Sequence, residues 1–432
     1  MTILEERDDT MRTYAFGWDF GNAETGAVMI VRGKHVRLTT PTAFARINTT
    51  TMQSLASLES GEQMEQSSGK RNAKKGQAVE AVGVDDPNAL LPVSEPDTIV
   101  VQLQGESTSY AFGKQALIQK DDPWTGRGDP QRYASSYALR GLLASSALMQ
   151  SDKEYGLCVV AGLPAQYYLD YPTLRDDIKA RLNGTFTFTV NGGQTWRTAH
   201  VEVAAIVMEG AGALMTYPGL SRTSEAAVID IGGGTTDLYA QVGATPLDTY
   251  CKGTPHAVES ATKIVRETFL RTYKRPLTDN EARDIMRAYA SGGKKKPFKS
   301  ISAFGKLVPV EEVQIMVEEA VGSIAEDIVG FISATWRDGI ARFTPIILIG
   351  GGAYYFYEAV KKRIGHVLKH DDPTFANAIG YATLAARKLL KKTQESAAVA
   401  VAVAEKAKSV VVVEAKAEPQ AIVVVAGVAV RE

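Results

Sequence analysis

The chain has 432 residues, of which 45% are hydrophobic and 22% charged, and this composition indicates a globular protein with more than one domain. The formal net charge of −1 excludes a broad basic surface, so direct nucleic-acid binding is not expected. No signal peptide or membrane span is recognisable, which predicts a cytoplasmic protein without a membrane partner.

The N-terminal part begins with a strand, a glycine turn and a second strand within residues 13–31. Residues 49–98 are rich in Ser, Gln, Gly, Lys and Glu, which predicts a polar, flexible insertion. Short strands are expected at 99–103 and 108–112, and a helix at 135–149. Cys158 and Cys251, the two cysteines, lie in or beside apolar strand-like segments and are expected to be buried thiols.

From residue 157 to residue 390 the sequence predicts both strands and helices. We expect strands at 157–161, 185–190 and 196–207, a helix from 209, a strand–turn–strand at 228–242, helices at 257–273, 280–289 and 310–336, a strand at 346–349 followed by a helix, and a last helix at 373–390. Residues 393–432 are low-complexity, rich in Ala and Val, and predict a disordered tail.

Three glycine turns, each directly after a short apolar strand, point to function: residues 16–22 (FGWDFGN), 228–237 (VIDIGGGTTD) and 345–353 (PIILIGGGA). The first two are followed by β-prone residues and therefore predict strand–turn–strand hairpins. Glycine lets backbone amides approach an anion closely, and consecutive amides form an anion-binding nest. We therefore expect the two hairpins to hold a polyphosphate between their tips, which indicates an ATPase. The expected donors are Gly21, Asn22, Ala23, Gly232, Gly233, Gly234, Thr235 and Thr236.

Asp19 and Asp230 stand just before the glycines of the first two turns. A carboxylate so close to phosphate would repel it unless a cation lies between them, so both residues predict a Mg²⁺ ion held through water. Either aspartate alone would be read as a turn cap; the pair favours the ion. The third turn, Gly350, Gly351, Gly352 and Ala353, opens a helix and is expected near the adenine ring or the α-phosphate.

Glu209 lies where a strand ends and a helix begins. A carboxylate there can orient the water that attacks the γ-phosphate, or can simply be an acidic residue favoured by the helix dipole. Physical reasoning alone leaves these two alternatives equal.

The order and spacing of the three turns resemble the actin-like ATPase superfamily, over roughly residues 14–390. Asp19-Phe-Gly21 is similar to its first phosphate motif, residues 230–237 to its second, and residues 349–353 to its adenosine motif. Residues 372–381 (DPTFANAIGY) resemble a C-terminal helix of the ParM-like and archaeal actin-like group. In that group the glutamate matching Glu209 positions the attacking water, so the resemblance favours the catalytic role.

The resemblance implies an α/β fold of two actin-like domains, a ribonuclease H-like duplication with nucleotide in the cleft between them. Domain I would cover 13–220 with 373–390 returning to it, and domain II 221–372. One departure is Gly26, where actin and ParM have a phosphate-contacting lysine; Thr25 is a substitute donor. Lys263 and Glu267 would approach the ribose, or form a solvated i,i+4 pair.

The resemblance also implies a function: a polymerising ATPase (ATP or GTP, with Mg²⁺) that forms head-to-tail filaments and segregates plasmid DNA through a DNA-binding adaptor protein. The alternative is a chaperone-like or reactivating ATPase that acts on a protein partner. That class usually has a substrate domain after the ATPase body, and the low-complexity tail is too simple to serve as one. A sugar kinase would need a catalytic base in a polar pocket, for which the sequence offers no convincing residue.

Overall fold

A computed structural model of the chain describes residues 11–47, 93–119, 123–192, 195–291, 298 and 300–414. Most of the insertion predicted at 49–98, and the tail from 415, lie outside these residues. By compactness the chain divides into one unit up to Ala386 and another from Arg387. The first unit holds both of the large sheets.

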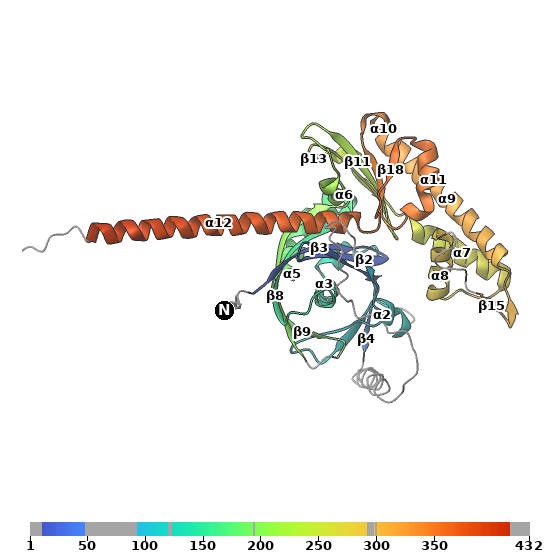
Figure 1. Cartoon of the computed structure of the whole chain (residues 1–432). Helices are drawn as coiled ribbons and strands as arrows, with labels where there is room; N and C mark the ends of the chain where they lie inside the picture. The colour runs from blue at the N-terminus through green and yellow to red at the C-terminus, as the bar shows by residue number, and fades with distance from the viewer. Residues whose placement is uncertain are drawn as a thin grey trace, which may run out of the picture. The chain divides into compact units, whose positions relative to one another are not determined.

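The first sheet has ten strands in the order β4-β7-β6-β9-β10-β8-β1-β2-β3-β5. We call the part of the chain built on it the first lobe (Figure 1). Its strands are β1 Thr13–Phe20, β2 Glu24–Val31, β3 Lys34–Pro41, β4 Phe44–Ile47, β5 Val93–Ser94, β6 Val100–Leu103, β7 Ser109–Phe112, β8 Glu154–Leu163, β9 Gly184–Val190 and β10 Arg197–Met208. Its helices are α2 Lys114–Gln119, η1 Pro130–Ala134, α3 Ser136–Leu148, α4 Ala165–Asp170, α5 Leu174–Leu182 and α6 Ala211–Thr216.

The central strand β1 is buried on both faces. Phe16, Trp18 and Phe20 alternate along one face and join the main apolar cluster of this lobe, because side chains two residues apart in a strand point the same way. The other face carries Gly17, where an added Cβ would lie 2.0 Å from the carbonyl oxygen of Ala378. A helix from the far end of the sequence therefore packs directly on the backbone of β1.

The second sheet has six strands, five of them in the order β13-β12-β11-β17-β18, with β14 paired to β12. We call the part built on it the second lobe. Its strands are β11 Glu225–Ile231, β12 Thr236–Val242, β13 Thr245–Pro246, β14 Lys252–Thr254, β17 Ile346–Ile349 and β18 Val367–Lys369. Its helices are η2 Asp248–Tyr250, α7 Val258–Tyr273, α8 Asp279–Ala290, α9 Val310–Trp336, α10 Gly339–Arg342 and α11 Ala353–Arg363, and a small hairpin joins β15 Ser302–Ala303 to β16 Lys306–Leu307.

Helix α9 has the bounds that the sequence predicts. Val313, Val317, Ala320, Ile324 and Ile328 are buried and recur every three or four residues, which places them on one helical face. This helix packs against α7 and α11. The second lobe consequently has an apolar cluster of its own, separate from that of the first lobe.

The two lobes repeat one strand arrangement. In the first, β1 pairs antiparallel with β2 and parallel with β8. In the second, β11 pairs antiparallel with β12 and parallel with β17. This duplication confirms the predicted actin-like α/β fold. Since compactness places both lobes in one unit, the domain limits expected at 220 and 373 stay predictions.

The C-terminal helix α12 spans Ala376–Glu414. Its first turns carry Ala378 and Ala382, which are buried against Val28 of β2. The sequence led us to expect disorder from Thr393, and this expectation is wrong for residues 393–414, which are helical. None of the helices in the described ranges combines the length and the apolar character needed to cross a membrane. Both cysteines are buried as predicted, and neither forms a disulfide.

Candidate nucleotide site

The turns of the two long hairpins meet in the structure. An added Cβ at Gly233 would lie 2.1 Å from Cβ of Ala23, and one at Gly234 would lie 2.7 Å from Cβ of Asn22. Glycine is required at both positions because any side chain would push the turns apart. The turns are therefore in direct contact, and no gap separates Gly233 from Ala23 where a phosphate was expected to lie.

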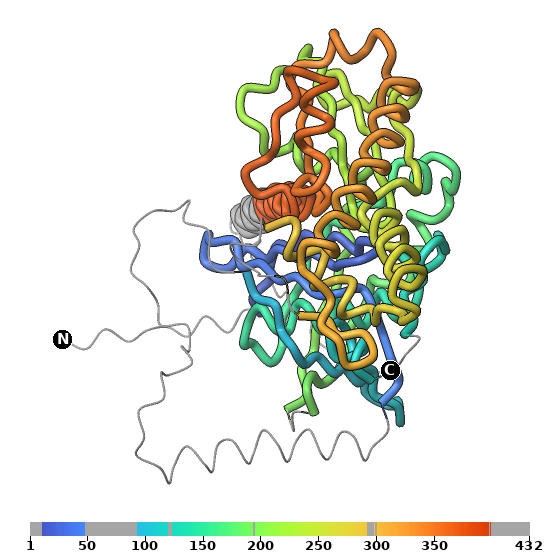
Figure 2. The backbone as a smooth tube through the Cα atoms, turned by 90° about the vertical axis from the view of Figure 1, so that its right-hand side faces the viewer, coloured from blue at the N-terminus to red at the C-terminus, as the bar shows by residue number. Residues whose placement is uncertain are grey.

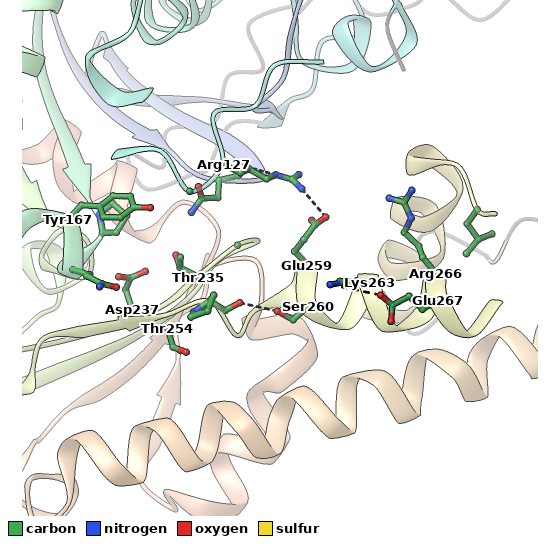
Figure 3. A pocket seen from close by; sticks show the side chains of 18 of the residues that line it. Arg127, Tyr167, Thr235, Asp237, Thr254, Glu259, Ser260, Lys263, Arg266 and Glu267 are labelled. Atoms are coloured by element: carbon green, nitrogen blue, oxygen red, sulfur yellow. Dashed lines mark hydrogen bonds and ion pairs between the residues drawn. The ribbon is translucent and has the colours of Figure 1, made fainter. Parts of the chain in front are cut away.

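A cavity of about 900 Å³ opens beside this contact and is lined by both lobes (Figure 3). A volume of this size suits a nucleotide-sized ligand. The first lobe contributes Asn22 from the turn after β1, Arg127 and Gly128 from the loop before η1, and Pro164, Gln166 and Tyr167 at the start of α4. The second lobe contributes the turn after β11 and the start of β12, strand β14 and the residue after it, helix α7, and the loop between α7 and α8: Gly234, Thr235, Asp237, Gly253, Thr254, Pro255, Glu259, Ser260, Lys263, Arg266, Glu267, Leu270, Pro276 and Leu277.

Four carboxyl groups gather behind the turns: Asp19, Glu209, Asp230 and Asp237. Asp237 is 2% exposed and Glu209 and Asp230 are each 8% exposed, so three of them are almost out of water. Burial raises the pKa of Asp19 and of Asp237 to about 6, and neighbouring Asp237 adds to the rise at Asp19. Burial, and then repulsion from the other carboxylates, raises the pKa of Glu209 and Asp230 well above their usual values.

Raised pKa values of this origin mean that negative charge is poorly compensated at the site. A divalent cation would supply that compensation. Within the described ranges, however, no three His, Cys, Asp or Glu side chains converge closely enough to hold a metal ion directly. The arrangement thus fits a cation held partly by water and phosphate, as expected for Mg²⁺, and does not fit a site made by protein ligands alone.

Two neutral or basic side chains, both missed from the sequence, stabilise the acidic cluster. Asn377 of α12 donates a hydrogen bond from Nδ2 to Oδ2 of Asp230 at 2.7 Å, and its Oδ1 accepts one from the amide of Gly210 at 3.0 Å. The amide of Ala165 likewise donates to Oδ1 of Asp237 at 3.0 Å. Asn377 therefore couples the second turn to the residue that follows Glu209.

Arg132 is the second side chain that stabilises the acidic cluster, and it is completely buried in η1. Its guanidinium donates to the carbonyl oxygen of Phe20, the residue before Gly21, and stacks on the rings of Phe20 and Tyr133. Its positive charge opposes the rise in the pKa of Asp19 and Glu209. Arg132 thus partly balances the acidic cluster from the first lobe.

The cavity lining includes only some of the predicted phosphate donors: Asn22, Gly234 and Thr235. Thr25 is completely buried, and its hydroxyl is hydrogen-bonded to that of Thr42 at 2.9 Å, so the structure does not present it as a donor to the cavity. Thr236 likewise donates to the carbonyl oxygen of His256 at 2.6 Å.

The remaining members of the first two turns have backbone roles. Gly232 donates its amide to Thr235 within the turn at 2.8 Å. Gly233 and Ala23 form the contact between the turns, and Gly21 lies where an added Cβ would be 2.5 Å from the carbonyl oxygen of Glu24. These residues shape the hairpins that carry Asn22 and Thr235 to the cavity.

The third turn lies against the second hairpin. Gly350 has a φ of +81°, and an added Cβ would lie 2.5 Å from Oδ1 of Asp230. Gly352 donates its amide to Ile231 at 2.7 Å. Among the described residues that line the cavity, none comes from Gly350, Gly351, Gly352 or Ala353. The turn thus supports the strand that holds Asp230, and its expected nucleotide contact stays a prediction.

Lys263 and Glu267 lie side by side on α7, with Nζ and Oε1 3.9 Å apart. Both side chains are largely exposed, and both line the cavity (Figure 3). The structure therefore combines the two alternatives left open by the sequence: the residues form an i,i+4 pair, and that pair faces the cavity.

Sequence reasoning also missed residues that line the cavity itself. Asp237 ends the second motif, and hairpin pairing places it directly opposite Asp230, so it could have been found from the strand register. Arg127, Gln166 and Tyr167 lie in the first lobe without a recognisable motif. Only the fold brings them to the cavity.

Family models match most of the chain. The N-terminal domain of actin-like proteins matches residues 17–212, and the C-terminal domain of archaeal MreB-like actin homologues matches residues 228–362. The chain belongs to the actin-like proteins. Its two model matches coincide with the first and second lobes.

Solved structures of actin-like proteins share this fold. The archaeal actin homolog Ta0583 is 19% identical, with a TM-score of 0.61 over 87% of this chain and 100% of its own, and it has also been solved in complex with ADP. A ParM from a 15-stranded filament of Clostridium botulinum is 16% identical, with a TM-score of 0.61 over 87% and 100% of the two chains. The actin-like protein Alp7A is 15% identical, with a TM-score of 0.61 over 89% and 100%. No curated protein sequence matched this actin-like chain.

Proposed function

We propose that this actin-like protein is an ATPase that polymerises in its nucleotide-bound state. The observation that carries the proposal is the meeting of the two hairpin turns beside a cavity of about 900 Å³ lined by both lobes. A ligand in that cavity contacts both lobes at once, so its binding and its hydrolysis change how the lobes are held together. The complex of Ta0583 with ADP supports a nucleotide as the ligand.

The cavity residues suggest how the nucleotide is bound. Asn22 and Thr235 offer an amide and a hydroxyl to the phosphates from opposite lobes, and Gly234 offers a close backbone approach. Lys263 and Glu267 on α7 hydrogen-bond the ribose. The base is adenine or guanine.

The acidic cluster provides the hydrolytic part of the site. Glu209, which is almost buried, orients the attacking water and accepts a proton from it; its pKa is raised by burial, which makes the carboxylate a stronger base. Asp19 and Asp230 would hold a Mg²⁺ ion through water, and that ion would offset the charge of the phosphates and carboxylates. Asn377 keeps Asp230 in position.

Head-to-tail association of such a protein forms a filament, because a contact between two different surfaces repeats without closing. The ParM filament of Clostridium botulinum supports this assembly. We further propose a cytoplasmic filament that segregates plasmid DNA through an adaptor protein, since the net charge of −1 leaves the chain without a basic surface of its own.

Light scattering and phosphate release, measured together, test this proposal. Purified protein should scatter light only after addition of ATP or GTP with Mg²⁺, and phosphate should be released as scattering falls. Nucleotide hydrolysis without polymer over a wide range of protein concentration would instead favour the chaperone-like class. Absence of nucleotide binding in calorimetry would overturn both.

A further inference from the structure

A small hairpin of the second lobe exposes two large apolar side chains. Phe304 is 79% exposed and Leu307 is 73% exposed, at and beside the turn that joins β15 to β16. Phe304 and Gly305 both have positive φ, at +49° and +80°, in a turn where Asn and Gly are the usual residues. A phenylalanine held in this conformation and in water marks a contact surface. We call Phe304 and Leu307 the knob.

A second cavity, of about 740 Å³, lies elsewhere on the same lobe. It is formed around α10, the edge strand β18 and the loop after α6, and its apolar lining includes Pro218, Leu220, Ile340, Pro345, Ile364 and Leu368. Leu368 is 45% exposed, although it is a large apolar residue. We call this cavity the hollow.

Helix α9 separates the knob from the hollow. It begins at Val310, three residues after Leu307, and ends at Trp336, three residues before α10 begins at Gly339. Its 27 residues span about 40 Å at 1.5 Å per residue. Figures 1 and 2 both show the hairpin and α10 at opposite ends of this helix. A knob so far from the hollow cannot fill it within one chain, so its occupant is another molecule.

The charges beside the two surfaces are mostly of opposite sign, although one basic residue, Lys306, is exposed between Phe304 and Leu307. Glu311 and Glu312 are exposed in the first turn of α9, beside the knob. Arg363 lines the hollow, and Lys362 is exposed next to it at the end of α11. Acidic residues around a protruding apolar group and basic residues around an apolar cavity favour their association.

We propose that the knob of one copy of this chain inserts into the hollow of the next. The inference rests on the proposed polymerisation and names the surfaces that carry it. The contact is heterologous, and since its two halves lie at opposite ends of α9, it repeats along one direction and generates an open chain of subunits.

Two single substitutions test the contact by sedimentation of polymer with ATP and Mg²⁺. Phe304→Ser removes the aromatic ring from the knob, and Leu368→Asp places a charge in the hollow. Each is expected to raise the critical concentration for polymerisation at least tenfold without changing nucleotide affinity. Ile118→Ser on α2, a side chain that is 69% exposed and belongs to neither surface, is the matched control and should polymerise as the wild type does.

Mixing the two variants gives a sharper result. The Phe304→Ser protein keeps an intact hollow, and the Leu368→Asp protein keeps an intact knob. An equimolar mixture should therefore form one-to-one dimers that grow no further, detectable by light scattering coupled to size exclusion, whereas each variant alone stays monomeric. A variant that failed to fold could not form such a dimer.

The outcomes separate this inference from the proposed function. Wild-type polymer together with normal polymerisation of both variants would overturn the knob-and-hollow contact and leave the polymerising ATPase intact. Monomers in the mixture would likewise exclude a complementary contact. Absence of nucleotide-dependent polymer from the wild type would overturn the proposed function and the contact with it.

Discussion

Arg127 of the first lobe donates a hydrogen bond from Nη1 to Oε1 of Glu259 of the second lobe, across 2.8 Å at the edge of the cavity. The same guanidinium donates from Nε to the carbonyl oxygen of Asn22 at 3.2 Å. Arg127 therefore connects the first hairpin turn to helix α7. Figure 3 shows this pair crossing the space between the lobes.

Replacing Arg127 with Ala should speed nucleotide dissociation severalfold, because the ion pair restrains the two lobes around the cavity. Both side chains are about 40% exposed, with values of 39% and 43%, so the change in folding free energy should stay below about 1 kcal/mol. Stopped-flow displacement of a fluorescent nucleotide measures the rate. Lys114→Ala, which breaks an exposed ion pair to Asp97 within the first lobe, is the control; equal rates for both variants would contradict the role of Arg127.

Replacing Glu209 with Gln should reduce the rate of phosphate release by about a hundredfold or more, since the amide cannot accept a proton from water. Nucleotide affinity should change little, because Glu209 lies behind the turns and is not among the described residues that line the cavity. A phosphate-release assay and calorimetry measure the two effects. Glu202→Gln, an exposed position on the same strand β10, is the matched control. Unchanged turnover of the Glu209 variant would remove its catalytic role.

Replacing Asp237 with Asn should stabilise the nucleotide-free protein at neutral pH. The pKa of Asp237 is raised to about 6 by burial, so the folded state binds a proton that the unfolded state loses near pH 4. The folding free energy of the wild type therefore becomes less favourable as pH rises from about 4 to about 6. The variant does not lose this stability, because asparagine does not ionise. At pH 7.5 we expect a gain of about 1 kcal/mol or more.

Urea unfolding of both proteins between pH 4.5 and 7.5 measures this difference. The gain should shrink towards the acid end of the range and should also shrink when Mg²⁺ and nucleotide are present. If the difference in unfolding free energy between the two proteins stayed constant across this pH range, ionisation of Asp237 would not destabilise the folded state, and the prediction would be wrong.

Replacing Gly26 with Lys should be tolerated and should tighten nucleotide binding, because the resemblance to actin and ParM implies a phosphate-contacting lysine at this position. Gly26 pairs with Asp19 across the first hairpin, and the nearest atom to an added Cβ is Cβ of Asp19, at 3.9 Å. An ammonium group at this place would offset the acidic cluster. Calorimetric titration with ATP and Mg²⁺ measures the affinity, and weaker binding would contradict this reasoning.

Gly17→Ala is the contrasting variant, in the strand before the same turn. Its Cβ would lie 2.0 Å from a backbone oxygen of α12, which cannot move as a flexible side chain can. We expect a loss of several kcal/mol in folding free energy, as for other overpacked cores. Soluble, fully stable Gly17→Ala protein would contradict the direct packing of α12 on β1.

Much of the fold was predictable because local patterns decide it. The bounds of α9 follow from its apolar periodicity, and the hairpins at Asp19 and Asp230 follow from glycine turns between β-prone segments. Periodicity and turn chemistry act over a few residues, and the sequence displays both directly.

The C-terminal helix shows where such patterns mislead. The low-complexity composition of residues 393–432 suggested disorder, but α12 continues to Glu414. Alanine and lysine favour helix, and extending a helix that has already begun avoids the cost of starting one. A prediction from composition alone does not include this gain from extending an existing helix.

The site was predictable only where its residues belong to a motif. Asn22, Gly234 and Thr235 were found in this way, whereas Arg127 has no motif around it and Asn377, although within the motif at 372–381, was given no role. Both reach the site through contacts between segments more than a hundred residues apart, as in the bond from Asn377 to Asp230. Thr25 shows the reverse, because it belongs to the first motif and yet its hydroxyl is buried and hydrogen-bonded to that of Thr42.

The seating of α12 on the first lobe has a consequence for biosynthesis. Gly17 in β1 and Gly212 in α6 both lie in contact with backbone atoms of residues 377–382. A ribosome makes those residues only after it has made the entire second lobe. The first lobe, although begun first, therefore cannot be completed during translation until the second lobe has emerged, and the backbone of β1 beside Gly17 stays uncovered for most of the synthesis of the chain.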